Sequence, residues 1–444
     1  MDDGRPPKEQ SARPNSRRYD ASTKFLERAE RVIPLGSQTF SKSKTQLPIG
    51  AAPLFVERGE GPYVFDLDGN RYIDFVCSLG AITMGHGDPD VMAAVQKQLQ
   101  SGVVFSLAHP LETYVAEKIV DMIPCAEKVR FGKNGSDATS GCIRVARGFT
   151  RRDRIAMCGY HGWQDWSIGT TARDLGIPKA TKDLTHTFPY DDLDALKKLL
   201  DSHPGEFAAI IMEPVAFTNP QPGYHAAVME LAHKAGALFV FDEVVTGFRF
   251  KEGSSQARFG VTPDLCALGK GMANGFPISV VAGRDEVMRL MEEVFFSFTM
   301  GGEAISLAAA DAVLTKIKTH NTLDTIATNG TRLLDGFRAR IATHGLSDVI
   351  ACNGDPSWSV ITIKDLPGLS QWELKTLWIQ ETARRGVLNI GIHFIGASHT
   401  AAVIDEALAV YDEVLGVVKQ AVDAGSVADL LECEPLKPLF RVRT

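Results

Sequence analysis

Two short, almost wholly apolar runs with a helical pattern between them constrain the fold of this chain more than any other feature. They occupy residues 208–212 and 237–241, and runs of this length are typical of strands. Strands that lack polar alternation are buried on both faces, as in a parallel sheet. Residues 226–235, between them, have helical spacing and are followed by Gly236, which predicts a helix with a glycine C-cap. The order strand–helix–strand predicts an α/β fold with a mostly parallel sheet.

The same alternation extends along much of the chain. Further strands are expected at residues 128–131, 154–158 and 278–282, and further helices at residues 137–149 and 401–422. Residues 61–74 predict a hairpin that turns at Asp68, Gly69 and Asn70. A long helical pattern begins at Ala304 and is expected to break near Asn329 and Gly330, and short strands are expected beyond Val349.

These elements predict one large domain and one smaller α+β domain built from both chain ends. The large domain is expected over residues 76–325, with helices on both faces of a mixed, mostly parallel sheet. The smaller domain is expected to combine residues 21–75 with residues 326–444. Residues 1–20 are polar and are expected to form a disordered leader.

The charge balance excludes several classes of protein. The 444 residues include 47 basic and 54 acidic ones, a net charge of -7, which argues against binding to nucleic acid. No apolar run approaches the ~20 residues that span a bilayer, and the first residues lack the apolar stretch of a signal peptide. The seven cysteines show no metal-binding spacing and suit the reducing cytoplasm. A cytoplasmic enzyme without a metal site, a membrane partner or a nucleic-acid partner is expected.

A carboxylate pair and a lysine mark the first candidate site. Asp242 and Glu243 end the buried strand, and Lys270 stands between two glycines further along the chain. Open parallel sheets bind ligands at the carboxyl ends of their strands. Desolvation of Lys270 would lower its pKa and supply the neutral amine that attacks a carbonyl carbon. Taken alone, these residues are more often a buried ion pair.

Two further segments follow predicted strands. Residues 132–139 (GKNGSDAT) open a helix, and backbone N–H groups there, with the Ser136 hydroxyl, are suited to a phosphate. An ordinary helix N-cap made by Asn134 or Ser136 is the alternative. Residues 159–163 (GYHGW) place Tyr160 where it either stacks on a flat ligand ring or packs in the core. A lysine amine, a carboxylate, a phosphate cradle and an aromatic ring together suit pyridoxal 5′-phosphate.

The segments that carry these residues resemble a known family. FDEVVTGFR, followed by LGKGMANGFP, is similar to the class III, fold-type I pyridoxal-phosphate aminotransferases, and most similar to their glutamate-1-semialdehyde aminomutase branch. The likeness extends from about residue 34 to residue 422. It includes DLDGNRYID, MGHGDP, NGSDAT, YHGW and IMEPV, and several motifs in the same order are more specific than any one alone.

The resemblance implies a role for each matching residue. Lys270 would bind the cofactor aldehyde covalently, Asp242 would keep the ring nitrogen protonated, and Val244 and Tyr160 would lie on the two ring faces. Lys270, Asp242 and Tyr160 are the implied catalytic residues. The other implied cofactor-binding residues are Gly135, Ser136, His161 and Thr299. Because the family's threonine at position 299 reaches the phosphate of the neighbouring subunit, a homodimer with shared active sites is implied.

The implied activity moves an amino group between a small amine donor and a carbonyl acceptor. The chain departs from the aminomutase pattern, with Phe217 and Thr218 in place of Gly-Asn, Glu303 and Ala304 in place of Asn-Pro, and Asp137 in place of Glu. Residues 389–394 hold no arginine to bind a substrate carboxylate.

Trp163 and Trp166, with Gln164 and Asp165, raise the hypothesis of a hydroxylated or sugar-like substrate. Packing of both tryptophans in the core or in a dimer interface is the alternative. An aminomutase, a racemase or a decarboxylase would use the same cofactor residues. A nicotinamide dehydrogenase would need GxGxxG, which residues 269–275 lack. A non-catalytic interaction protein would need neither Lys270 nor Asp242.

Overall fold

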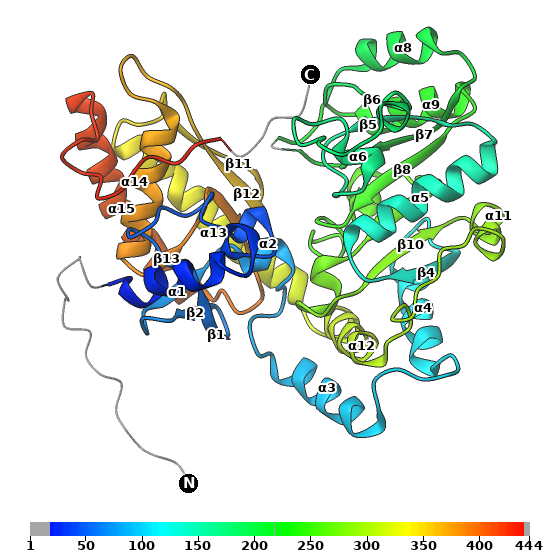
Figure 1. Cartoon of the computed structure of the whole chain (residues 1–444), viewed down its shortest axis with the longest axis horizontal. Helices are drawn as coiled ribbons and strands as arrows, with labels where there is room; N and C mark the ends of the chain where they lie inside the picture. The colour runs from blue at the N-terminus through cyan, green and yellow to red at the C-terminus, as the bar shows by residue number, and fades with distance from the viewer. Residues whose placement is uncertain (1–17, 217, 439–444) are drawn as a thin grey trace.

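A seven-stranded sheet forms the centre of the larger part of the molecule (Figure 1). The computed structural model describes residues 18–216 and 218–438. Across the sheet the strand order is β4-β10-β9-β8-β7-β5-β6. The strands are β4 (Lys128–Gly132), β5 (Arg154–Cys158), β6 (Thr185–Thr187), β7 (Phe207–Met212), β8 (Leu238–Glu243), β9 (Leu265–Leu268) and β10 (Ser279–Gly283). Only β10 runs antiparallel to its neighbours, so the expected mixed, mostly parallel α/β sheet is confirmed.

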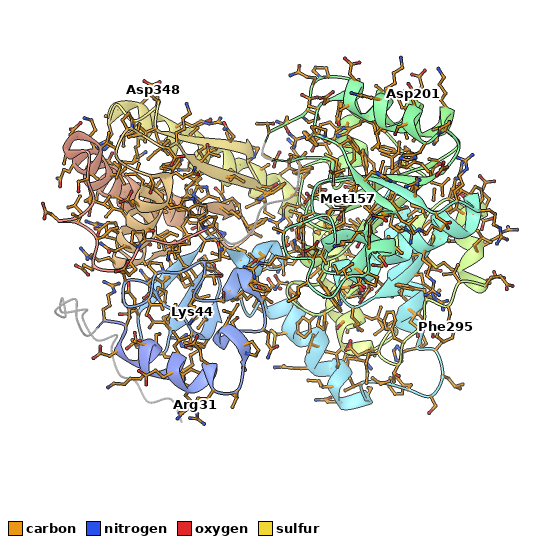
Figure 2. The ribbon with its side chains drawn as sticks, turned by 45° about the horizontal axis from the view of Figure 1, so that its top comes forward. Arg31, Lys44, Met157, Asp201, Phe295 and Asp348 are labelled. Carbon is orange, nitrogen blue, oxygen red and sulfur yellow. The ribbon has the colours of Figure 1, made fainter. Side chains whose placement is uncertain are left out.

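The apolar runs are explained by burial on both faces of this sheet. Every residue of β7 and β8 is buried. Along β7, Ile210 belongs to one apolar core and Ile211 to a second core on the opposite face. Side chains alternate across a strand, so a run with two buried faces has no polar positions. Met157 of β5 lies inside the second core, whereas Asp201 and Phe295 lie at the periphery (Figure 2).

Helices cover both faces of the sheet. Those of this region are α3 (Pro89–Ser101), α4 (Pro110–Met122), α5 (Gly135–Thr150), α6 (Asp165–Ile168), α7 (Lys179–Lys182), α8 (Leu193–Ser202), α9 (Tyr224–Lys234), α10 (Ser255–Phe259), α11 (Asp285–Met288) and α12 (Ala304–Thr319). Helix α5 packs on the face that carries Ile211, and α9 packs against β8. The predicted helices at residues 137–149 and 226–235 are therefore confirmed as α5 and α9.

Segments from both chain ends lie side by side in the other part of the molecule (Figure 1). One sheet has the order β1-β2-β3-β13, and the other has β11-β12-β14. The strands are β1 (Val56–Glu60), β2 (Tyr63–Asp66), β3 (Arg71–Asp74), β11 (Ile350–Asp355), β12 (Trp358–Ile363), β13 (Val387–Leu388) and β14 (Ile392–Phe394). The accompanying helices are α1 (Asp20–Glu30), α13 (Thr322–Thr343), α14 (Gln371–Arg384) and α15 (Ala401–Ala424). The predicted hairpin is confirmed as β2 and β3, and β13, from the other end of the chain, pairs in parallel with β3. The predicted domain boundaries stay a prediction.

The predicted helix break near Asn329 and Gly330 is wrong. Both residues lie inside α13, and the interruption falls earlier, between α12 and α13 at His320 and Asn321. Gly330 serves a packing role instead, because an added Cβ there would lie 1.9 Å from the carbonyl oxygen of Pro356. Glycine therefore allows the helix to approach the β11–β12 turn, and it does not end the helix.

The predicted disordered leader and the predicted absence of a membrane span concern different parts of the chain. Most of the expected disordered leader, residues 1–17, lies outside the described residues, and α1 begins at Asp20. Phe217 also lies outside them. Among the residues that are described, none of the helices combines the length and apolar character needed to cross a membrane.

Candidate active site

A cavity of about 450 Å³ lies at the carboxyl ends of β4, β5, β7, β8 and β9. Ligands of open α/β sheets bind at this edge. Seven of the eight predicted site residues line the cavity: Gly135, Ser136, Tyr160, His161, Asp242, Val244 and Lys270. These residues come from four separate strand-to-helix or strand-to-loop junctions, so the topology of the sheet brings them together.

The two carboxylates at the end of β8 face opposite sides of the sheet. Asp242 lines the cavity. Glu243, one residue later, accepts a hydrogen bond of 2.6 Å from the backbone N–H of Ser255 on the other side. Burial raises the pKa of Glu243. Because strand side chains alternate in direction, only Asp242 is available to a ligand in the cavity.

His161 holds the carboxylate of Asp242 in place. Its Nδ1 lies 2.8 Å from Asp242 Oδ2, and its Nε2 lies 3.1 Å from the carbonyl oxygen of Cys158. A carbonyl oxygen only accepts, so Nε2 carries a hydrogen. Asp242 Oδ1 also accepts from the backbone N–H of Val244 at 3.1 Å, so the carboxylate is oriented from two directions.

The start of α5 is a capped helix that borders the cavity. Asn134 is the N-cap, and its side-chain oxygen accepts from the N–H of Asp137 at 3.2 Å. The Asp137 carboxylate accepts in return from the N–H of Asn134 at 3.0 Å, which completes a capping box. Since Asn134 makes the cap, Ser136 does not; Ser136 lines the cavity, and its Oγ accepts a hydrogen bond from the N–H of Trp163. At Gly135 an added Cβ would lie 2.7 Å from Val244 Cγ1, so glycine keeps this wall open.

Lys270 lies just beyond β9, in the short 3-10 helix Lys270–Ala273. Its backbone is left-handed, with φ +44. Burial lowers the pKa of its ammonium group, while Asp242 and Glu213 oppose this change and Arg249 adds to it. The net direction favours the neutral amine, as the sequence predicts.

Glu213 is a site residue that the sequence reasoning missed. It follows β7 as Asp242 ends β8, it lines the cavity, and its Oε2 accepts from the N–H of Tyr160 at 3.1 Å. Burial and the nearby Asp242 raise the pKa of Glu213. The signal that identified Asp242, a carboxylate at the end of a buried strand, applied equally to Glu213. Tyr160 stands beside it with its ring half exposed to the cavity.

Other predicted residues lie elsewhere. Trp166 is buried and its indole N–H donates to Ser140 Oγ at 2.9 Å, so it cannot contact a substrate in the cavity. The hypothesis is therefore wrong for Trp166, whereas Trp163 is exposed and lines the cavity. Thr299 lies on an exposed turn outside the cavity. The role of Thr299 in a neighbouring subunit stays a prediction.

The cavity brings together a lysine whose pKa is lowered, a carboxylate held by hydrogen bonds, a helix N-terminus that begins with glycine, and an aromatic ring. This set of groups fits pyridoxal 5′-phosphate. Residues 47–352 match the family model described as aminotransferase class-III. The chain belongs to this family. It is a pyridoxal-phosphate-dependent transaminase, because class III aminotransferases use this cofactor.

Several proteins of known name are similar to the chain over most of its length. A 3-aminobutyryl-CoA aminotransferase of Cloacimonas acidaminovorans is 35% identical, over 87% of this chain and 94% of that protein. A glutamate-1-semialdehyde 2,1-aminomutase of Roseiflexus castenholzii is also 35% identical, over 85% and 93% respectively. The pyridoxal-phosphate form of the FumI protein of Sphingopyxis sp. MTA144 superposes with a TM-score of 0.85 at 28% identity, over 93% of this chain and 98% of that one.

Proposed function

We propose that this class III transaminase transfers an amino group from a small amine donor to a small carbonyl acceptor through Lys270. One observation carries the proposal: Lys270 and Asp242 face the same cavity beside the start of α5. A lysine nucleophile and a ring-nitrogen partner are the two groups that pyridoxal phosphate requires of a protein.

In the proposed mechanism the bound cofactor supplies an electron sink, and the residues of the chain bind, orient and move protons. Lys270 would hold the cofactor covalently, and its Nζ, once free, would take the proton from the substrate carbon that carries the nitrogen. Asp242, oriented by His161, would hold a proton on the ring nitrogen. Tyr160 and Val244, which line the cavity, would pack against the ring.

The proposed phosphate site is the first turn of α5, at Gly135 and Ser136. Backbone N–H groups at a helix start carry partial positive charge and point out of the helix, so they bind phosphate without a lysine or arginine. The loop at residues 159–163 is tied to this turn, because Ser136 Oγ accepts from the N–H of Trp163 at 3.3 Å and Thr139 Oγ1 donates to the carbonyl oxygen of His161 at 2.7 Å. The phosphate site and the ring site are thus held in one rigid arrangement.

The two relatives of known name favour two related activities. An aminotransferase acting on a short amino-acyl compound is supported by the 3-aminobutyryl-CoA relative. A 2,1-aminomutase, which returns the amine to the same carbon skeleton, is supported by the equally similar aminomutase. A hydroxylated or sugar-like substrate has less support, because Trp166 is buried and neither name indicates such a compound.

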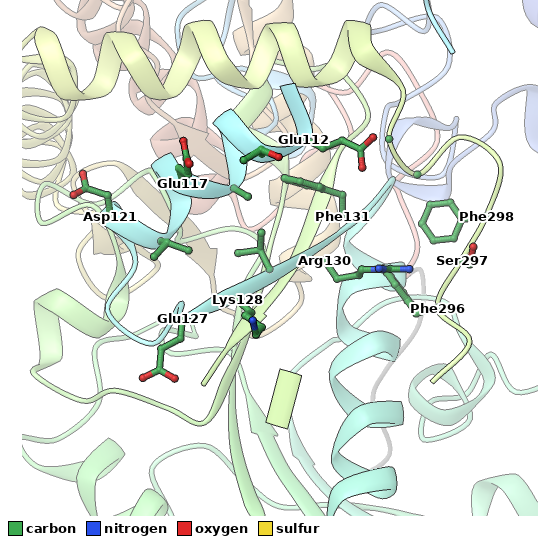
Figure 3. Close-up of a pocket in the computed structure, with 16 residues that line it drawn as sticks. Glu112, Glu117, Asp121, Glu127, Lys128, Arg130, Phe131, Phe296, Ser297 and Phe298 are labelled. Atoms are coloured by element: carbon green, nitrogen blue, oxygen red, sulfur yellow. The ribbon is translucent and has the colours of Figure 1, made fainter. Parts of the chain in front are cut away.

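We further propose a homodimer in which Thr299 reaches the partner's cofactor. Exposed apolar side chains gather on the two adjoining segments at residues 103–107 and 295–300, which are joined where the N–H of Ala304 donates to the carbonyl oxygen of Val103. A second cavity, of about 770 Å³, opens beside Phe296 and Phe298 (Figure 3). Exposed apolar area of this kind marks a protein interface, and the resemblance identifies a second copy of the chain as the partner.

The thiol groups support a reducing location. All seven cysteines are free, and six are buried. Burial raises the pKa of the Cys142 and Cys158 thiols, which keeps them protonated and unreactive. Free thiols of this kind persist in a reducing compartment, so we propose the cytoplasm.

The experiment is a half-reaction screen on purified holoenzyme. L-Alanine, β-alanine, 3-aminobutyrate and glutamate-1-semialdehyde are each mixed with the yellow protein in the absence of an acceptor, and loss of the yellow absorbance is followed. We expect at least one amine to bleach it, and a carbonyl acceptor to restore it. Conversion of glutamate-1-semialdehyde to its isomer without any second carbonyl compound would identify the aminomutase instead. A protein that takes up no cofactor would refute both.

A further inference from the structure

A strained turn forms one wall of the cavity. Residues Cys77–Gly80 (α2) have four successive left-handed φ values, namely +46, +51, +61 and +83. Three of the four are not glycine, and left-handed backbone is costly for residues with a Cβ. Such a conformation persists only where the surrounding structure over-determines it, and it occurs often at functional sites.

The turn presents two side chains to the site. Ser78 and Leu79 line the same cavity as Lys270 and Asp242. Lys42 Nζ donates to Ser78 Oγ at 2.9 Å, which adds a second segment to the wall. None of these three was identified from the sequence, where Cys77, Ser78 and Leu79 have no residue type that favours left-handed backbone.

Asp74 fixes the beginning of the turn. Its Oδ1 accepts hydrogen bonds from the backbone N–H groups of Val76 and Cys77, at 2.9 and 3.0 Å. Its Oδ2 lies 2.9 Å from His86 Nε2. These bonds orient the chain as it enters the turn, but they do not reach its end at Gly80.

Arg249 fixes the end of the turn. Its Nη2 donates to the carbonyl oxygen of Gly80 at 2.6 Å, and its Nη1 donates to that of Ile395 at 3.2 Å. Beside Lys270, a Cβ added to Gly271 would lie 3.5 Å from Arg249 Nη2 and 3.6 Å from the Gly80 carbonyl oxygen. The guanidinium group of Arg249 therefore donates hydrogen bonds to the turn and to the segment after β14, and it lies beside the segment that carries Lys270.

Among residues 18–216 and 218–438, no carboxylate lies within ion-pair distance of Arg249, and Asp355, the carboxylate that acts on it electrostatically, is paired with Arg258. The side chain of Arg249 is 1% exposed, and burial lowers its pKa to about 10. Its acceptors are neutral oxygens, and its Cζ lies 5.1 Å from the centre of the Phe394 ring. An apolar residue would fill this space without the cost of a buried charge, but only a planar fork of donors binds several carbonyl groups at once.

We propose that Arg249 is a positioning residue that holds the left-handed turn Cys77–Gly80 against the Lys270 segment and so sets the substrate-side wall of the active site. This role rests on the proposed function, and it makes Ser78 and Leu79 residues that determine which amines fit. Without Arg249 the turn relaxes toward ordinary backbone, and the wall loses its fixed position. Among the described residues, Arg249 makes no hydrogen bond to Asp242, to Lys270 or to the start of α5, and it acts on Lys270 only through its charge.

The test compares Arg249→Met, which removes charge and donors, with Arg249→Lys, which keeps the charge and loses the fork. Arg152→Met is the matched control, because Arg152 Nη1 also binds backbone carbonyl oxygens, those of Ala235 and Phe207 at 2.7 and 3.2 Å, away from the cavity. Hydrogen exchange is measured by mass spectrometry in the holoenzymes, over peptides that span residues 75–84. Half-reaction constants are measured with L-alanine and with the bulkier 1-phenylethylamine.

We expect Arg249→Met to keep its yellow absorbance and to exchange at least tenfold faster over residues 75–84, with little change elsewhere. The ratio of KM values for the two amines should change at least fivefold, and the limiting rate with the better donor less than threefold. For Arg249→Lys, the exchange rate over residues 75–84 and the KM ratio should both lie between those of wild type and Arg249→Met. If the methionine variant does not fold, the lysine variant is compared with wild type instead. Arg152→Met should alter neither quantity.

Unchanged exchange over residues 75–84 in either variant would overturn the positioning role, whichever amine the enzyme uses. An unchanged KM ratio with accelerated exchange would also overturn it, because the turn would then move without consequence for the substrate. A wild-type holoenzyme that reacts with no amine would refute the proposed function instead, and the exchange measurement would still decide whether Arg249 holds the turn.

Discussion

The two walls of the active-site cavity are built in different ways. The cofactor wall consists of strand ends and a helix start, where backbone ladders and a capping box fix the residues that surround Asp242. The opposite wall, Cys77–Gly80, has strained backbone, and the side chains of Asp74 and of the distant Arg249 bond to its two ends. The first wall is regular structure that supplies a fixed geometry, and the second stores backbone strain that tertiary contacts must offset.

The strongest test of the cofactor wall is Lys270→Ala. The variant loses the amine that binds the cofactor and moves the proton, so turnover should fall by about 10⁴-fold. The yellow absorbance of the lysine-bound cofactor should disappear as well. Steady-state rates and visible spectra of the purified variant check both. A variant that remains yellow and active would show that another residue binds the cofactor.

The adjacent carboxylates of β8 offer a matched pair. Asp242→Asn should keep cofactor binding but lower turnover by about 10²–10³-fold, because it no longer stabilises the proton on the ring nitrogen. Glu243→Gln should leave the rate within about twofold, since that side chain faces the other side of the sheet and burial already favours its neutral form. Equal effects of the two substitutions on kcat would contradict the conclusion that Asp242 faces the cavity and Glu243 faces the other side of the sheet.

Two glycines of α5 distinguish the phosphate cradle from the rest of the helix. Gly135→Ala places a Cβ 2.7 Å from Val244 Cγ1 and should weaken cofactor binding by about tenfold, a cost typical of overpacking. Gly148→Ala, whose Cβ would lie 3.7 Å from Val294 Cγ2, should leave binding unchanged and stabilise the helix by about 0.5–1 kcal/mol. Fluorescence titration of the apoenzymes with pyridoxal phosphate measures the difference. Similar affinities would place the phosphate elsewhere.

The smallest expected effect concerns strain in the opposite wall. Ser78→Gly and Ser78→Ala both remove the bond from Lys42, but only glycine tolerates φ +51 at no steric cost. The glycine variant of the apoenzyme should therefore be about 1 kcal/mol more stable than the alanine variant. Denaturant unfolding of the two apoenzymes gives the comparison. Equal stabilities would mean that the turn is not strained.

Most of the cofactor wall could be predicted because each of its residues follows a pattern that is local in sequence. Asp242 follows an apolar strand, Ser136 opens a helix, and Tyr160 follows a strand between glycines. The same reasoning missed Glu213 although its signal was present. It also placed a helix break at Gly330, where the structure shows a close approach to Pro356. The presence of a glycine does not indicate whether it ends a helix or allows another segment to pack closely against the helix, since both roles depend on the absence of a side chain.

The sequence by itself determined the α/β class, five of the seven strands of the central sheet and most of the predicted residues that line the cavity. The physical reason is that burial on two faces and helix capping leave local traces in residue type and spacing. Only the tertiary structure decided that Asp242 is paired with His161, that Trp166 is buried, and that Arg249 meets the left-handed turn. These contacts join segments that are far apart in the chain. A local sequence pattern therefore does not indicate them, nor the strained backbone that they keep in place.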